Sequence, residues 1–351
     1  MNRGGDGPVA AGASERNRYL VLAVLLVLLG GSAVLGMTVG AYDIGPAEVF
    51  RVLFGRFFPE LDDGGISPLH CTVIWNLRLP RLLLNIGVGV ALASAGAVFQ
   101  GCFRNPLVEP YILGVSSGAA FGAALGILFP RFALSIQGLA FVFSALAVCG
   151  AYGLGRVRNE TSVVGLVLAG VIIGSVFSSL VGVLKYMAHD AALREIVFWL
   201  MGGFYYAGWR DVQIVAPVVL VSFAGMWLHA WKLNVLSMGD EEARAMGVHP
   251  ERWKGLFIAL ATLATAVSVA SVGVIAWVGL MMPHATRLMV GPDHRYLLPA
   301  AALLGGIYLV VCDTLARTLT SAEIPIGILT SLLGAPYLFY LLRSRGKMVF
   351  G

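Results

Sequence analysis

The chain has 351 residues, of which 58% are hydrophobic and 12% are charged, and its mean hydropathy is +0.84. This composition lies far from that of soluble domains and argues against a water-soluble α protein with a large core. A membrane span needs roughly 20 apolar residues, so the chain has room for up to about ten spans. The net charge of +5 fits basic residues that flank membrane spans, and no nucleic-acid partner is expected.

Ten apolar segments are expected to form helices of an all-α, polytopic membrane fold. They cover residues 19–39, 80–103, 111–129, 135–155, 163–185, 211–231, 252–275, 277–290, 298–318 and 326–343. The eighth segment is too short to span straight, so we expect a tilted or partly buried helix. The first is longer than the apolar core of a usual signal peptide, which favours a retained span over a cleaved signal.

The distribution of basic residues predicts the orientation. An even number of spans places both termini on one side, and with the N-terminus inside, fifteen of the 24 basic residues lie on the inner side. We therefore predict a multi-pass protein of the cytoplasmic (inner) membrane with both termini in the cytoplasm. Residues 1–18 are expected to be a disordered leader, 19–345 a single permease-like membrane domain, and 346–351 a cytoplasmic tail.

Small residues recur at four-residue spacing in two of the expected helices. Gly118, Gly122 and Gly126 lie in one, and Gly170, Gly174 and Ser178 lie in another. Such spacing lets helix backbones approach closely where lipid supplies no hydrophobic drive. The pattern predicts a tight helix bundle, with packing inside the chain at least as probable as a dimer seam.

The hydrophilic stretch SMGDEEARAMGVHPERWK, residues 237–254, separates two of the late spans. Acidic residues at its start and Gly247 after the helical portion match the helix dipole and a helix stop, so we expect a short cytoplasmic helix within 237–248. The chain contains no GxxxxGK[ST] phosphate loop, because its one Gly-Lys pair, at 346–347, is followed by methionine. The chain is therefore not expected to be an ATPase itself.

Four sequence motifs carry a family resemblance. They are RLPRLLLNIGVGVALASAGAVFQGCFRNPLVEPYILGVSSGAA (from 78), VGLMMPHATRLMVGPDHRYLLP (278–299), DTLAR (313–317) and EIPIGILTSLLGAPYLFYLL (323–342). In this order, over about residues 19–343, the chain resembles the permease subunits of ATP-binding-cassette importers for iron chelates, haem and vitamin B12. The resemblance implies a type II importer permease that works as a homodimer.

The resemblance also implies the partners of the chain. Two cytoplasmic ATPase subunits would bind ATP and magnesium, one extracytoplasmic binding protein would deliver the cargo, and this chain would bind no cofactor and carry no catalytic residue. The helix within 237–248 would be the coupling helix that docks into the ATPase, as opposed to a solvated linker helix. Its expected coupling residues are Gly239, Asp240, Glu241, Ala243, Arg244, Met246 and Gly247.

Three arginines match the family positions that receive acidic residues of the binding protein, namely Arg78, Arg81 and Arg317. The planar guanidinium can hold a carboxylate with two hydrogen bonds, which suits such docking. Asp313 lies four residues before Arg317, so the simpler interpretation of this pair is an intrahelical ion pair.

Four further residues match positions that narrow the cytoplasmic end of the transport path in the family. These gate residues are Asn105 and Leu107, in the turn after residue 103, and Thr161 and Ser162, in the next cytoplasmic loop. Asn and Pro are ordinary turn formers, so a simple connection is the alternative for the first turn.

Other function classes find less support in the sequence. His284 and His294, with Asp293 next to the second, fall in different local environments and have no further ligand that converges on them. His70 and His189 are single loop histidines, so no metal site is expected. The four cysteines are scattered without a metal-binding spacing. A secondary transporter or channel would carry ionisable residues within its spans, and a membrane enzyme would cluster His, Asp or Cys at one face.

The cargo is the least constrained property. We expect an iron chelate, either a ferric siderophore or haem, because these are the commonest cargoes of the family. Cobalamin and molybdate remain alternatives. The acidic residues Glu60, Asp62 and Asp63 in the expected outer loop do not separate these cargoes.

Overall fold

The computed structural model describes residues 15–40, 42, 44–55, 67–131, 133–157, 160–161 and 163–349. Its helices are α1 (Glu15–Thr38), α2 (Pro46–Gly55), α3 (Pro68–Thr72), η2 (Val73–Arg78), α4 (Leu79–Phe103), η3 (Pro110–Leu113), α5 (Val115–Leu128), α6 (Ile136–Gly155), α7 (Val163–Met187), α8 (Asp190–Met201), α9 (Trp209–Leu228), α10 (Ala230–Met238), α11 (Asp240–Ala245), α12 (Pro250–Val272), α13 (Val278–Val290), α14 (His294–Thr318) and α15 (Ile326–Val349). Strands β1 (Arg156–Val157) and β2 (Glu160–Thr161) pair antiparallel between α6 and α7.

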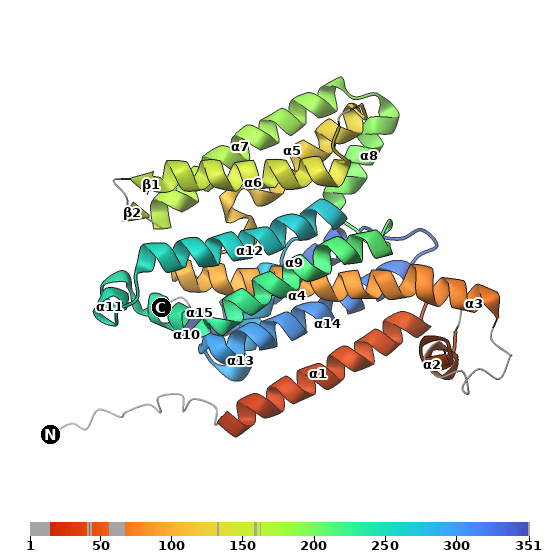
Figure 1. Ribbon diagram of the computed structural model, residues 1–351, viewed down its shortest axis with the longest axis horizontal. Coiled ribbons are helices and arrows are strands. Elements are labelled where there is room, and N and C mark those ends of the chain that lie inside the picture. Colours follow the sequence, from red (N-terminus) through yellow and green to blue (C-terminus); the bar gives the residue numbers. More distant parts are fainter. Residues whose placement is uncertain are drawn as a thin grey trace.

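The helices form two adjoining groups (Figure 1). Helices α5, α6, α7 and α8 pack together in one group, and α1, α4, α9, α12, α13 and α14 form the other. Helix α4 lies at the centre of the second group, where α9, α12, α13 and α14 surround it. Helices α6 and α12 lie next to each other and join the two groups.

The all-helical polytopic fold agrees with the sequence analysis. Each of the ten expected segments contains a helix, and seven helices of the described residues are long and apolar enough to cross a membrane. The central spans are largely buried, because 78% of the apolar window of the helical run Pro68–Phe103, which ends in α4, lies inside the protein, against 17% for α7. Helix α13, the short eighth segment, is partly buried as expected, since Val278, Met282 and Thr286 on it are inaccessible or nearly so.

Sequence periodicity missed the short helices α2, α3, η2, α8 and α10 and misplaced one boundary. The apolar segment 211–231 is divided, because α9 ends at Leu228 and a separate helix, α10, follows. Helices α2 and α8 lie in segments that were expected to be loops. Both helices are amphipathic and bury one narrow apolar face. Neither contains an apolar run long enough to cross a membrane. The 1–18 leader lies largely outside the described residues.

Glycine permits the close helix packing that the sequence predicted. A Cβ atom on Gly118 or Gly122 would lie 2.4 Å from the Phe143 carbonyl oxygen or 2.3 Å from that of Leu139, so these glycines pack α5 against α6. A Cβ atom on Gly170 would lie 2.0 Å from the Ile112 carbonyl oxygen. These contacts are within the chain, whereas a Cβ atom on Gly174 would meet only the Ser117 hydroxyl, at 3.4 Å.

The tightest contact joins α4 to α13. A Cβ atom on Gly96 would lie 1.8 Å from the carbonyl oxygen of Gly279, and one on Gly89 would lie 2.3 Å from that of Gly305 on α14. Cβ atoms do not occur at such distances from backbone oxygens, so any larger residue forces the helices apart. Two small residues therefore set the distance from α4 to both neighbours.

We expect Gly96→Ala to destabilise the protein by about 1–3 kcal/mol or more, because overpacking against backbone cannot be relieved by a rotamer change. Thermal unfolding of the purified protein in detergent measures this. Gly31→Ala in α1 is the matched control, since nothing lies within 4 Å of its added Cβ atom. Equal melting temperatures for the two variants would contradict the close contact.

Candidate transport and coupling sites

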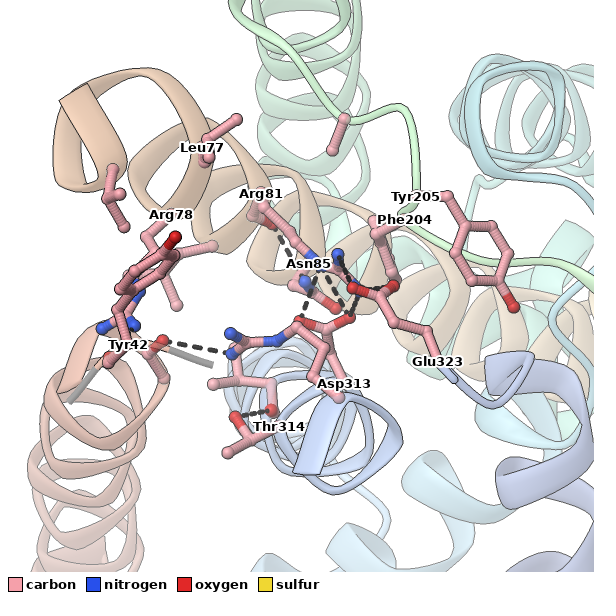
Figure 2. A pocket seen from close by; sticks show the side chains of 16 residues that line it. Tyr42, Leu77, Arg78, Arg81, Asn85, Phe204, Tyr205, Asp313, Thr314 and Glu323 are labelled. Atoms are coloured by element: carbon pink, nitrogen blue, oxygen red, sulfur yellow. Dashed lines mark hydrogen bonds and ion pairs between the residues drawn. The ribbon is translucent and has the colours of Figure 1, made fainter. Parts of the chain in front are cut away.

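The three arginines expected to receive the binding protein converge on one cavity. The cavity has a volume of about 330 Å³ and lies between the ends of α4 and α14 and the segment after α1. Arg78, Arg81 and Arg317 all line it, together with Asp313 and Glu323 (Figure 2). Residues 78 and 317 are far apart in sequence, so the close packing of α4 on α14 brings them together.

Arg81 is held between two carboxylates, as Figure 2 shows. Its Nε and Nη2 atoms donate to Asp313, with an Nη2–Oδ1 distance of 2.8 Å, and its Nη2 atom also lies 2.9 Å from Oε2 of Glu323. The Asp313 side chain is 4% exposed and the Glu323 side chain 37% exposed. One carboxylate is therefore a buried anchor, and the other reaches the surface.

The other two arginines hold the backbone after α1. Arg78, buried between α4 and this segment, donates to the carbonyl oxygens of Met37, Thr38 and Tyr42. Arg317 forms the expected intrahelical ion pair with Asp313, at 3.2 Å from Nε to Oδ2, and also donates to the carbonyl oxygens of Gly36 and Val39. All three guanidinium groups thus have partners within the chain.

The sequence analysis did not assign a role to three of the residues around this cavity. Glu323 pairs with Arg81 across 242 residues of sequence, so no local spacing could reveal the pair. Asn85 is 1% exposed and donates from Nδ2 to the Arg81 carbonyl oxygen. Tyr205 lines the cavity, and burial together with the nearby Glu323 carboxylate raises the pKa of its phenol to about 12.

The helix expected within 237–248 is α11, flanked by two glycines with positive φ. Gly239 has φ +151° and Gly247 has φ +76°. Within α11 the Ala243 side chain is fully buried, whereas Glu241 and Arg244 are exposed. Met246, the residue after the helix, is also exposed. Of the expected coupling residues, these three and Gly247 therefore face outward, whereas Gly239, Asp240 and Ala243 face the protein.

An ion pair fixes α11 to α12. The Nζ atom of Lys254 lies 2.6 Å and 2.7 Å from the two carboxylate oxygens of Asp240. The Lys254 side chain is 3% exposed, although it belongs to a span, and the Asp240 side chain is 31% exposed. Removing one partner of a buried ion pair leaves an uncompensated charge, so this contact ties the position of α11 to that of α12.

A second polar cluster joins α10 to the start of α14. Asn234 donates to Asp293 at 2.7 Å and accepts from the backbone of His294 at 2.8 Å. Burial alone would raise the pKa of the Asp293 carboxyl, but hydrogen bonds from Arg295 and Asn234 outweigh burial and lower that pKa to about 2. This cluster holds the helix before α11 against the central group.

The expected gate residues are only partly described. Asn105 accepts a hydrogen bond from the Leu107 amide at 2.9 Å, which closes the turn after α4, and the Leu107 side chain is 47% exposed. Thr161 lies in β2, opposite Arg156, and Ser162 lies outside the described residues. His294 is buried at the first residue of α14 and His284 is buried in the middle of α13, and the described part of the chain holds no group of three or more His, Cys, Asp or Glu residues that could bind a metal.

These features define a class of protein. A bundle of apolar spans carries a charged cavity at one end and, between two spans, an exposed short helix pinned to the membrane domain, in a sequence without a phosphate loop. Such an arrangement is that of a polytopic, all-helical membrane domain with polar contact sites outside its apolar spans.

Comparison with known proteins identifies the family. The profile of the FecCD transport family matches residues 24–344. The chain is 41% identical to the hemin transport system permease protein HmuU of Yersinia pestis, covering 93% of this chain and 96% of that protein. It is 38% identical to the molybdate import system permease protein MolB of Haemophilus influenzae, covering 93% and 97%.

A third relative is the cobalamin import system permease protein BtuC of Halobacterium salinarum, 42% identical over 80% of this chain and 76% of that protein. A solved structure of an inward-facing metal-chelate type ABC transporter is also similar, with a TM-score of 0.82, 36% identity, and coverage of 93% of this chain and 99% of that chain. The chain belongs to the FecCD family. It is a multi-pass permease subunit of an ABC importer and is not itself an ATPase.

Proposed function

We propose that this permease passes an iron chelate, a ferric siderophore or haem, across the inner membrane as a homodimer. Two ATPase subunits bind ATP and magnesium on the cytoplasmic side, where both termini lie, and a binding protein delivers cargo from the other side. The observation that carries the proposal is α11, whose inner face is pinned by the Asp240–Lys254 pair and whose outer face exposes Glu241, Arg244 and Met246.

Relatives of similar identity are named for hemin, molybdate and cobalamin. Cobalamin and molybdate therefore stand as alternative cargoes for the same machinery. Two relatives from Helicobacter pylori, at 36% identity, are named as iron chelatin permeases, which supports the iron-chelate choice.

We expect one cargo to stimulate ATP hydrolysis and to enter liposomes that hold the permease, its ATPase and its binding protein. The binding protein is loaded in turn with a ferric siderophore, haem, cobalamin or molybdate, and both phosphate release and uptake are measured. Stimulation by cobalamin or molybdate alone would replace the iron-chelate assignment. An ATPase that never associates with the permease would contradict the importer proposal.

The charged cavity is our proposed docking site for the binding protein. Arg81 already holds two carboxylates, and the outer one, Glu323, is partly exposed. An incoming carboxylate can take the place of Glu323 on the same guanidinium, because the fork of Arg81 points toward that position. Docking would then exchange one ion pair for another without exposing an unpaired buried charge.

We expect Glu323→Gln to strengthen docking, since it removes the internal competitor for Arg81. Arg81→Glu should weaken docking about tenfold or more, which corresponds to about 1.4 kcal/mol. Surface plasmon resonance with the loaded binding protein measures both affinities, and Arg131→Glu, on the outer loop before α6, serves as control. Unchanged affinity in both cavity variants would place docking elsewhere.

Lys254 is our proposed positioning residue for coupling. Because its ammonium holds Asp240 at the start of α11, force on α11 from an ATPase passes to α12. We expect Lys254→Met to reduce ATP-driven uptake about tenfold, which corresponds to about 1.4 kcal/mol, while ATP hydrolysis continues, since the variant leaves α11 without its ionic contact to α12.

The matched controls for this prediction are Lys254→Arg and the double variant Asp240→Asn with Lys254→Met. Lys254→Arg keeps the ion pair with Asp240, whereas the double variant removes both charges and so leaves neither one uncompensated, a replacement that is often close to neutral in free energy. Partial recovery of the uptake-to-hydrolysis ratio in Lys254→Arg but not in the double variant supports the coupling role, whereas recovery in the double variant would show that only the unpaired charge had mattered. A ratio that never changes in Lys254→Met would show that the pair is structural only.

Asn105, Leu107, Thr161 and Ser162 are proposed as the cytoplasmic gate. The exposed Leu107 side chain, held at a turn that Asn105 closes, supports this role. In the reconstituted liposomes without ATP, Leu107→Ala should raise cargo leak, and an unchanged leak would remove Leu107 from the gate.

A further inference from the structure

A groove with a volume of about 490 Å³ runs along the seam between α6 and α12. These two helices connect the two helix groups of the fold (Figure 1). The side chains that line it belong to residues spaced three or four apart on each helix. From α6 they are Phe141, Ala145, Val148, Cys149, Tyr152 and Gly153, and from α12 they are Gly255, Ile258, Ala259, Thr262, Leu263 and Ala266.

The length of the α6–α12 groove matches one leaflet of a bilayer. The α12 residues that line it run from Gly255 to Ala266, which corresponds to about 17 Å at about 1.5 Å per residue. Half of a hydrocarbon core of about 30 Å is about 15 Å. Gly255 lies in the second turn of α12, shortly after α11, so in the proposed orientation the groove extends from the cytoplasmic surface to the bilayer centre.

The lining of the α6–α12 groove does not suit water. A buried water typically makes about three hydrogen bonds to polar groups. The hydroxyl groups among the lining residues belong to Tyr152 and Thr262, and the rest of the lining is apolar apart from the Cys149 thiol. Among the described residues the buried Thr262 hydroxyl has no hydrogen-bond partner. A water in the groove would therefore find at most the two hydroxyl groups and the thiol, and these are weak replacements for its usual partners.

The surface beside the groove is also unlike a helix interface. Its exposed neighbours are large aliphatic residues, including Leu146 and Leu154 on α6 and Leu256 on α12. Membrane helices that contact other helices use small residues instead. Such residues are exposed on α7, at Ser178, Ser179 and Gly182, so α7 is the better face for a second copy.

The mouth of the groove carries a positive charge. Arg252 is exposed and lies three residues before Gly255, so it continues the groove face by one turn of α12. Exposed basic residues next to a span attract anionic headgroups of the cytoplasmic leaflet. We propose that the α6–α12 groove binds one acyl chain of an anionic phospholipid from the cytoplasmic leaflet, whose headgroup contacts Arg252. The assignment to the cytoplasmic leaflet depends on the proposed orientation of the chain, whereas the groove itself is a feature of the structure.

Photocrosslinking tests the site on the full-length permease. The protein is placed in nanodiscs of phosphatidylethanolamine and phosphatidylglycerol, in which the latter carries a diazirine midway along one acyl chain. We expect adducts on peptides 141–153 and 255–266 to exceed those on the exposed α9 segment 220–228 by about tenfold, the ratio given by a preference of about 1.4 kcal/mol.

Ala259→Phe and, as a milder change, Ala145→Leu fill the α6–α12 groove and should abolish this excess. Leu256→Phe, on the exposed face of α12 outside the lining, should retain it. Arg252→Ala should remove the advantage of the phosphatidylglycerol probe over a phosphatidylethanolamine probe. Transport is not the readout, so the test is independent of the importer proposal.

Two outcomes would overturn the lipid site. Equal adduct density on α9 and in the groove would mean ordinary contact with bulk lipid. Formation of a Cys149–Cys149 disulfide between two copies on mild oxidation, in a Cys71→Ser background, would show that a second copy covers the groove. The remaining cysteines, Cys102 and Cys312, are buried and do not compete.

Discussion

The close backbone contact of α4 with α13 and α14 is the constraint on which the rest of the structure depends. Gly96 lies against Gly279, and Gly89 lies against Gly305. Because no side chain separates these backbones, α4 and its neighbours form a stiff central unit in an environment where lipid provides no hydrophobic drive for association. One end of this unit carries charged groups on α4 and α14, and further charged groups lie beside its other end, on α12 and α11. The geometry of both sets follows from the spacing of the helices.

At one end the spacing places Arg81 of α4 against Asp313 of α14, and at the other the buried Lys254 of α12 holds Asp240 of α11. A buried charge without a partner is costly in either place, so each pair specifies one arrangement of its helices. The partly exposed carboxylates, Glu323 and Asp240, lie where an outside protein can reach them. These are the two contacts that we propose for the binding protein and for the ATPase.

Much of the fold was predictable from the sequence, because span length and small-residue spacing are local properties. The ten apolar segments, the close packing at Gly118 and Gly122, and the Asp313–Arg317 pair at four-residue spacing all agree with the structure. The short helices α2 and α8 were missed, since a helix of about three turns with one narrow apolar face resembles a loop in a search for spans. Helix α10 was missed because its first residues continue the apolar segment of α9. The partners of Arg81 and Lys254 were also missed, because contacts across 242 residues, or across a loop of unknown path, depend on tertiary structure.

The buried charged side chains within the spans are paired with one another or with neighbouring helices. In the described spans, Arg81, Lys254, Asp313 and Arg317 have partners within the chain. Their charges therefore hold helices together and are not displayed as a ladder of sites for cargo or protons. The α6–α12 seam differs, because there the two helix groups meet across an apolar groove without an ion pair among its lining residues. The groove leaves α6 and α12 less tightly packed than the glycine contacts leave α4. If α12 moves through its ion pair at Lys254, as proposed, we expect the contact between α6 and α12 to change before the packing around α4 does.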